Sequence, residues 1–169
     1  MSALPARIRR EIRDTISEAR AYDVERLGAI LPKVPTRAQI VKLENELRKL
    51  QTFDIEPVHH FAKGIYAREL TIPAGTIITG KVHRTEHLNI VSKGCITVWT
   101  EEGMKTVSAP FTMVSNPGTK RVGYAHEDTV WTTVHGTEKR DLEELERELI
   151  EPETYAIESD NLPALEMEK

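Results

Sequence analysis

The sequence predicts a mainly β protein, built as an antiparallel sandwich or barrel, with helices on its N-terminal side and one helix on its C-terminal side. Between Val58 and His135, short runs that alternate apolar and polar residues follow one another with turn residues between them. No helical pattern interrupts these runs, which excludes a sheet built from strand-helix-strand units. The segments on either side carry apolar residues at helical spacing. A chain of 169 residues is long enough to bury one core.

The predicted strands are short and closely spaced. Their separators are rich in glycine, proline, asparagine and aspartate, which favour turn geometry; Pro73-Ala-Gly75 and Asn116-Pro-Gly118 are the clearest. Many short strands of this kind are typical of all-β sandwiches and barrels. We expect strands at residues 65–72, 77–82, 87–91, 95–100, 105–108, 111–115, 121–125 and 129–135.

Three amphipathic helices are predicted outside the strands. Thr36 followed by Gln39 has the spacing of a capping box, which marks the start of the second helix. Helices this short are marginal alone, so their apolar stripes should pack on the core or between subunits. We expect three parts: a helical extension at 1–52, the β-barrel at 53–136, and a helix with an acidic tail at 137–169. The apolar stripes are Ile8, Ile12 and Ile16; Ile40, Leu43, Leu47 and Leu50; and Leu142, Leu145 and Leu149.

Composition excludes several classes of protein. The net charge of -4 and the pI near 5.9 give no basic surface, so we expect no nucleic-acid binding. No apolar stretch approaches the roughly 18 residues of a membrane span. The single cysteine, Cys95, excludes an intrachain disulfide, and the N-terminus has no secretion signal pattern. We therefore expect a cytoplasmic protein that does not contact membranes.

Two histidines four residues apart are the main chemical feature. They lie in the frame Gly75, five residues, Lys81-Val-His83, three residues, His87, six residues, Gly94. A tight turn between two antiparallel strands can bring imidazoles from both strands to one point. The spacing therefore suggests a metal site.

This frame resembles the first of two signature motifs of the cupin superfamily. Gly75 and Gly94 match the family's glycines and His83 its second histidine, whereas Lys81 stands where the first histidine would be and His87 where a glutamate would be. In the second motif, Pro117-Gly118 match, but Arg121 takes the place of a histidine. Cations thus replace two of the four expected ligands.

The resemblance implies a jelly-roll barrel, that is, an antiparallel double-stranded β-helix. The residues 59–69 and 123–131 also look like parts of small cupin-like proteins of bacteriophages and prophages, which would place the protein in the host cytoplasm or in a virion. Cupins host enzymes, isomerases, sensors and storage proteins, so the fold alone does not define an activity.

Three interpretations of the histidine region stay open. A metal site would use His83, His87 and a third ligand, which is His135, Glu86, His59 or His60, and would bind a divalent ion such as Zn, Fe, Ni or Mn. If the cations Lys81 and Arg121 share the space, they oppose a metal ion and instead favour an anion, with Glu86 beside them. A hydrogen-bonded cluster with no ligand is the third interpretation.

The sequence accordingly gives three hypotheses on function and assigns no catalytic residue. The favoured one is a non-catalytic, phage-type barrel that acts as an oligomeric structural or ligand-binding component. Its partners would be copies of itself, through the helices and the barrel face, and other virion or host proteins. The alternatives are a metal-dependent dioxygenase or isomerase acting on a small polar substrate, and a sensor of an anion or sugar.

Overall fold

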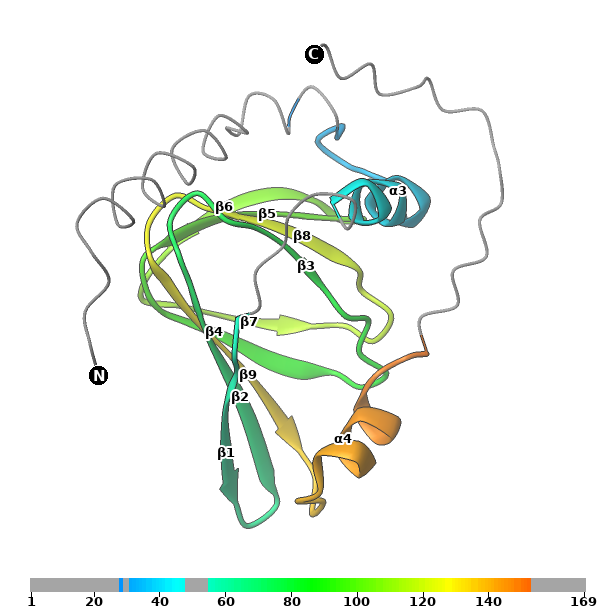
Figure 1. The fold of residues 1–169 in the computed structure, drawn as a ribbon, viewed down its shortest axis with the longest axis vertical. Helices are drawn as coiled ribbons and strands as arrows, with labels where there is room; N and C mark the ends of the chain where they lie inside the picture. Colours follow the sequence, from blue (N-terminus) through cyan, green and yellow to red (C-terminus); the bar gives the residue numbers. More distant parts are fainter. Residues whose placement is uncertain (1–27, 29–30, 48–54, 153–169) are drawn as a thin grey trace, which may run out of the picture.

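The computed structural model describes residues 28, 31–47 and 55–152, and within them two antiparallel β-sheets face each other (Figure 1). Among these residues, nine strands and the two helices α3 and α4 confirm the mainly β prediction. The barrel is corrected in one respect: no strand pairing joins the two sheets, so they form an open sandwich. The stripe of Ile8, Ile12 and Ile16, together with Leu50 and the tail after residue 152, lies outside the described residues.

The first sheet has five strands in the order β1-β2-β9-β4-β7. In chain order, its strands are β1 (Val58–Ala62), β2 (Ile65–Ile72), β4 (His87–Lys93), β7 (Phe111–Ser115) and β9 (Thr129–Gly136). The second sheet has the order β3-β8-β5-β6. Its strands are β3 (Ile77–Gly80), β5 (Cys95–Thr100), β6 (Gly103–Ser108) and β8 (Arg121–Ala125).

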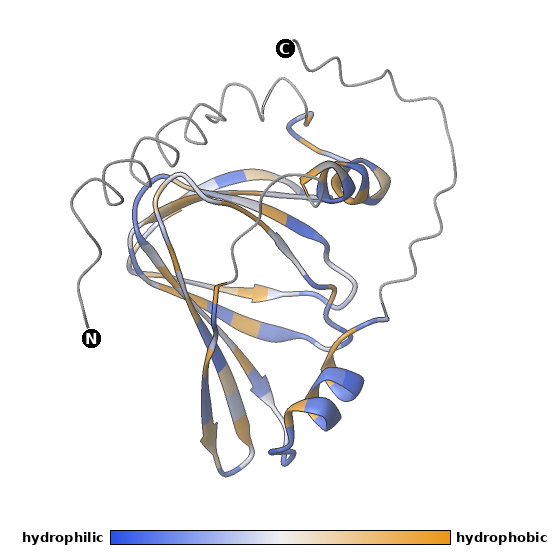
Figure 2. Cartoon of the chain, in the orientation of Figure 1, coloured by the Kyte–Doolittle hydropathy of each residue, from blue (hydrophilic) through white to orange (hydrophobic). Residues whose placement is uncertain are grey.

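The core between the sheets is apolar at one end only. The buried residues Ile72, Val91 and Trp131 of the first sheet pack with Ile96 and Val98 of the second. Because successive strand residues point to opposite faces, the neighbours of these residues point outwards. The strands show this alternation as bands of hydrophobic and hydrophilic residues in Figure 2. Toward the other end of the first sheet, the same inner face carries polar residues.

Helix α3 (Arg37–Leu47) covers the outer face of the four-stranded sheet. Its start has the predicted capping box: the backbone N–H of Thr36 donates to Gln39 Oε1 at 2.8 Å, and that of Gln39 donates to Thr36 Oγ1 at 3.3 Å. The helix buries Ile40 and Leu43 against the sheet, and a buried ion pair joins Glu44 Oε2 to Lys120 Nζ at 2.8 Å. Apolar packing and one paired charge therefore hold this helix in place.

Helix α4 (Leu142–Leu149) lies at the opposite end of the molecule, beside β9 (Figure 1). Leu145 and Leu149 are buried against Tyr66 of β2, Leu142 is 48% exposed, and the remaining residues of the helix are charged (Figure 2). Neither α3 nor α4, nor any other helix in the described part of the chain, is long and apolar enough to cross a bilayer.

A substitution at Gly94 tests whether this motif glycine is required for stability. Gly94 has φ +83°, and a Cβ atom there would lie 2.4 Å from the backbone oxygen of Asp128. We expect Gly94→Ala to lower the free energy of unfolding by about 2–4 kcal/mol, because left-handed strain and a backbone clash add together. Urea unfolding followed by circular dichroism measures this loss.

Gly118→Ala is the matched control. Gly118 has φ +80°, but a Cβ atom there would meet nothing within 4 Å. In this variant the free energy of unfolding should decrease by only about 1–2 kcal/mol, the energy of placing alanine in a left-handed conformation. Equal losses in the two variants would show that the contact with Asp128 is unimportant.

Candidate metal centre

Three histidines from separate parts of the chain meet on the inner face of the five-stranded sheet. His87 begins β4, His135 lies near the end of β9, and His83 lies in the loop between β3 and β4. Their ring centroids are 4.3 Å apart for His83 and His87 and 4.8 Å apart for each of the other two pairs. One ligand nitrogen from each ring lies within 4.8 Å of the other two. His135 is thus the residue that joins the sequence-predicted pair.

Strand register places two of these rings side by side. Leu88 of β4 pairs with Val134 of β9, so the preceding and following residues, His87 and His135, are neighbours on the inner face. On its other side, His87 pairs with Ser115 of β7. A one-residue shift of β4 would turn His87 outwards, so this register is a condition for the cluster.

The chain beyond α4 holds the third histidine in place. His83 forms an isolated antiparallel bridge with Ile150. The backbone N–H of Arg84 donates to Leu149 O at 2.8 Å, and that of Glu151 donates to Val82 O at 2.9 Å. His83 therefore depends on a segment more than sixty residues later in the sequence for its position.

Burial keeps the imidazoles neutral. Burial, followed by the nearby His87 and His135, lowers the pKa of His83 to about 3. Burial and then His87 lower the pKa of His135 to about 4. Burial also lowers the pKa of His87, against the opposing effect of its hydrogen bond to the backbone of Thr85. A neutral imidazole is the form that binds a metal ion, so the cluster is in the ligating state at neutral pH.

The free nitrogens of the cluster fit a metal ion. His87 Nδ1 lies 2.9 Å from the carbonyl oxygen of Thr85, so Nδ1–H donates there and Nε2 carries the lone pair. His87 Nε2 and His83 Nδ1 are buried and have no hydrogen-bond partner. At bond lengths of about 2.1 Å, two ligand nitrogens can be at most about 4.2 Å apart, so binding would draw the rings slightly together. Three nitrogens leave a coordination position open.

A buried polar network lies directly behind the cluster. Asn89 Oδ1 accepts hydrogen bonds from Trp131 Nε1 at 2.9 Å and Thr133 Oγ1 at 3.2 Å, and Asn89 Nδ2 donates to Ser115 Oγ at 2.6 Å. The guanidinium of Arg121 also donates to Ser115 Oγ. Arg121 is mostly buried, its Nε has no partner, and burial lowers its pKa.

The other predicted site residues are placed differently. The ammonium of Lys81 pairs with the carboxylate of Glu146 in α4. This pairing offsets the positive charge of Lys81, which we expected from the sequence to oppose a metal ion. Glu86 is exposed and outside the cluster, and Arg121 pairs with neither Glu69 nor Glu86. The remaining histidines have other contacts: His59 with Tyr66 Oη, His60 with Glu69, and the exposed His126 with Thr97.

A cavity of about 210 Å³ opens beside the cluster, between the first sheet and α4. His83 and His135 border it, as do Lys81 and Arg68. Arg68 was not predicted from the sequence, because a strand arginine that lines a cavity cannot be distinguished by sequence from one that points into solvent. The spacing of Leu142, Leu145 and Leu149 predicted the helix, but nothing in the sequence predicted that it walls this cavity.

Comparisons with known proteins found similar solved structures. No family model matches the chain, and no curated protein matches it. A cupin-2 domain protein from Shewanella frigidimarina is similar in structure, with 14% identity over 56% of this chain and 92% of that chain and a TM-score of 0.42. KdgF from Halomonas sp. has 17% identity over 56% of this chain and 91% of that chain, with a TM-score of 0.44. The Cnp3 cupin domain from Schizosaccharomyces pombe has 15% identity over 60% of this chain and 76% of that chain, with a TM-score of 0.43.

These similarities concern the fold and give no information on ligand or activity. The chain is a mainly β protein, and cupin-domain proteins are among its solved structural neighbours. The predicted mainly β class, with antiparallel sheets and a described helix on each side of them, is confirmed, and the sheets are open rather than closed. The histidine cluster on the inner face is the candidate site of this fold.

The cluster predicts a specific pH dependence of stability in chelated protein. Unfolded histidines take up protons below a pKa of about 6.5, whereas folded His83 and His135 do so only near 3 and 4. The free energy of unfolding should therefore be highest above about pH 7 and should decrease as the pH falls, by about 1 kcal/mol per histidine at pH 5.5. Urea unfolding at pH 7 and 5.5 measures this difference.

Replacement of both residues, in His83→Asn/His135→Asn, should flatten this dependence. The control is His60→Gln, because His60 lies on the outer face with an exposed side chain and should keep the wild-type dependence. If the double variant has the same pH dependence as the wild type, the two imidazoles are not buried in neutral form.

Proposed function

We propose that this chain binds one divalent transition metal ion through His83, His87 and His135 and acts as a metal-dependent enzyme on a small substrate. The observation that carries the proposal is the pair of buried, unpartnered nitrogens, His87 Nε2 and His83 Nδ1, in a cluster of three neutral imidazoles. An unsatisfied buried polar atom is costly unless a ligand completes it. The sequence had favoured a non-catalytic role because only two ligands could be named without conjecture.

Two further features support an enzyme over a structural ion site. Structural zinc sites use four protein ligands, whereas catalytic sites use three and keep one position open. The cluster offers three ligands among the described residues and borders a cavity that a substrate can enter. Bound there, the ion would supply Lewis-acid polarisation of a substrate oxygen, or redox chemistry if it is iron or manganese. Zn, Fe, Ni and Mn all accept imidazole ligands, and the dioxygenase and isomerase classes both fit this description.

The backbone around the cluster fixes the orientation of the ligands. Thr85 O holds the tautomer of His87, and the bridge to Ile150 holds His83. Such supporting contacts contribute to metal affinity because they order the ligand side chains before the ion binds, so less conformational entropy is lost on binding. Arg121 acts on the same ligands, because after burial its charge contributes to lowering the pKa of His83 and His87. This charge opposes a bare divalent ion, as expected from the sequence, and an anionic ligand on the ion would offset it.

Metal analysis tests the proposal directly. The purified chain, after incubation with Zn²⁺, Fe²⁺, Ni²⁺ or Mn²⁺ and desalting, should retain about one equivalent of at least one of these ions. A hundredfold excess over the dissociation constant should raise the free energy of unfolding by about 2.7 kcal/mol. Elemental analysis and thermal unfolding measure the two effects.

The double variant His87→Ala/His135→Ala should bind the ion roughly a hundredfold or more weakly, because one ligand remains. His126→Ala is the matched control, since His126 is exposed and outside the cluster. Wild-type protein that retains none of the four ions would remove the proposal.

A second candidate function comes from the outer face of the five-stranded sheet. Leu88 and Val114 are cross-strand partners and are 41% and 59% exposed, and Val58 and Ile65 on β1 and β2 are 53% and 47% exposed. Exposed apolar groups on one sheet face are typical of interaction surfaces. They support the oligomeric structural or ligand-binding component that the sequence favoured, with copies of itself and, if the phage resemblance holds, virion or host proteins as partners.

Charge on this face should separate the subunits. We expect Leu88→Lys/Val114→Lys to reduce the native mass measured by light scattering, because two buried ammonium groups would oppose association. Val34→Lys is the control, since Val34 is 58% exposed in the loop before α3. A wild-type monomer would contradict this second candidate.

A further inference from the structure

The cavity beside the histidine cluster has two chemically distinct sides. One side is the inner face of the first sheet, with His135, Tyr66 and Arg68. The other side is α4, with Leu142, Leu145 and Leu149. A ligand in this space would therefore contact cationic and imidazole groups on one side and leucine side chains on the other.

Among the described residues, Arg68 has no hydrogen-bond or ion-pair partner for its side chain. It lies on the inner face of β2, in register between His59 of β1 and Thr133 of β9, and is partly buried. Its guanidinium makes no hydrogen bond or ion pair in the described part of the chain, whereas Lys81 at the same cavity is bound to Glu146. Burial and then the charge of Arg68 lower the pKa of His59, which also lines the cavity.

The charge balance of the cavity favours an anion. Lys81 and Glu146 offset each other, and Glu146 is the single carboxylate among the described residues that line the cavity. Arg68 is then an uncompensated positive charge, and a divalent ion on the histidines would add two more. A planar guanidinium with free N–H groups matches a carboxylate in geometry and charge.

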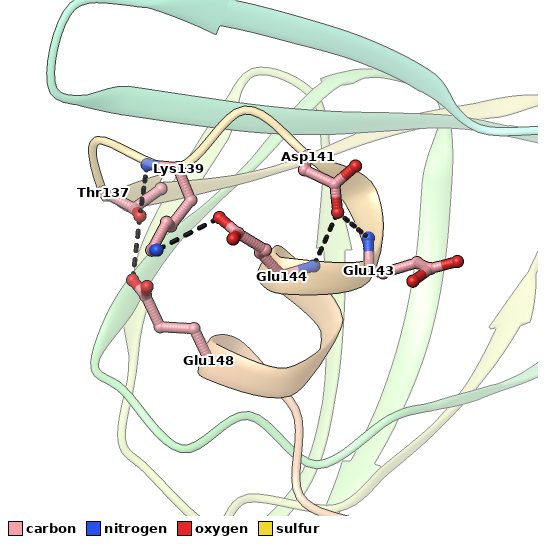
Figure 3. A network of polar contacts seen from close by, with 6 residues as sticks. All are labelled: Thr137, Lys139, Asp141, Glu143, Glu144 and Glu148. Carbon is pink, nitrogen blue, oxygen red and sulfur yellow. Dashed lines mark hydrogen bonds and ion pairs between the residues drawn. The ribbon is translucent and has the colours of Figure 1, made fainter.

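Helix α4 is anchored well enough to form a wall. Its N-cap residue Asp141 accepts hydrogen bonds from the backbone N–H groups of Glu143 and Glu144 at 3.1 and 3.0 Å (Figure 3). Outside the cavity, Lys139 Nζ pairs with Glu144 at 3.1 Å, and Thr137 Oγ1 donates to Glu148 at 2.8 Å. Arg37 of α3 also binds Glu151, directly after the helix. The leucines of α4 therefore form a fixed apolar surface.

We propose that this cavity binds a small organic carboxylate, with the carboxylate on Arg68 and the apolar part of the ligand against Leu142 and Leu145 of α4. The inference rests on the proposed function, because it names the class of substrate for the same site. The cavity volume of about 210 Å³ limits the ligand to a few carbon atoms beyond the carboxylate.

Calorimetry with sodium salts of acetate, butanoate and hexanoate tests the inference on metal-loaded full-length protein. Affinity should increase from acetate to butanoate, because each added methylene removes apolar area from water. Butanol and butylammonium, which lack the negative charge, should bind at least tenfold more weakly than butanoate. Inorganic phosphate should also bind more weakly than butanoate, because it has no apolar part to bury against Leu142.

Substitutions at two positions test which residue contacts each end of the ligand. Arg68→Met should weaken butanoate binding at least tenfold, and Arg68→Lys should retain part of the affinity. Leu142→Asn, at a residue that is 48% exposed, should reduce the preference for butanoate over acetate. Arg140→Met is the control, because Arg140 is exposed and does not line the cavity. Each variant is compared with the wild type at an equal fraction of folded protein, measured by circular dichroism.

The result separates this inference from the proposed function. Retained metal without carboxylate binding would overturn the inference alone. Carboxylate binding that depends on Arg68 in protein that retains no metal would support it while removing the metal-dependent function. Equal binding of butanol and butanoate, tighter binding of phosphate, or unchanged affinity in Arg68→Met would each overturn it.

Discussion

A single buried amide holds together the strands that carry the site. Asn89 is 1% exposed, and its side chain joins β4 to Trp131 and Thr133 of β9 and to Ser115 of β7. These partners exist in one register only, since a shift by one residue would move Asn89 to the outer face. The same register sets His87 beside His135. The amide therefore contributes to specificity as well as stability, and the imidazoles depend on it without touching it.

Much of the fold could be predicted from the sequence because its signals are local. Alternation indicated eight strands, and the spacing of Thr36 and Gln39 indicated a helix start whose hydrogen bonds are present. β1 was not predicted as a separate strand, because this edge strand has almost no buried side chain and thus no alternation to detect. The open arrangement of the sheets was missed for another reason: closure depends on pairing between strands far apart in the chain.

The site could be predicted only in part, for the same physical reason. His83 and His87 are separated by a short turn, so their spacing was informative. His135 was one of several candidates for the third position, because its approach to His87 depends on β4 pairing with β9. The pairing of Lys81 with Glu146 and the position of Arg68 at a cavity both depend on the docking of α4. A sequence gives little information on contacts of this range.

The bridge between His83 and Ile150 makes the candidate site depend on contacts of long range in the sequence. Arg84 contacts Ile150 across 66 residues of sequence, and Thr85 lies near His135 across 50. Contacts of such long range form late, because the intervening chain must be ordered first. A nascent chain that has not yet emerged beyond residue 150 cannot hold all three imidazoles together. The position of His83 is thus coupled to the docking of the segment that follows α4, so a change in that segment would also change the candidate site.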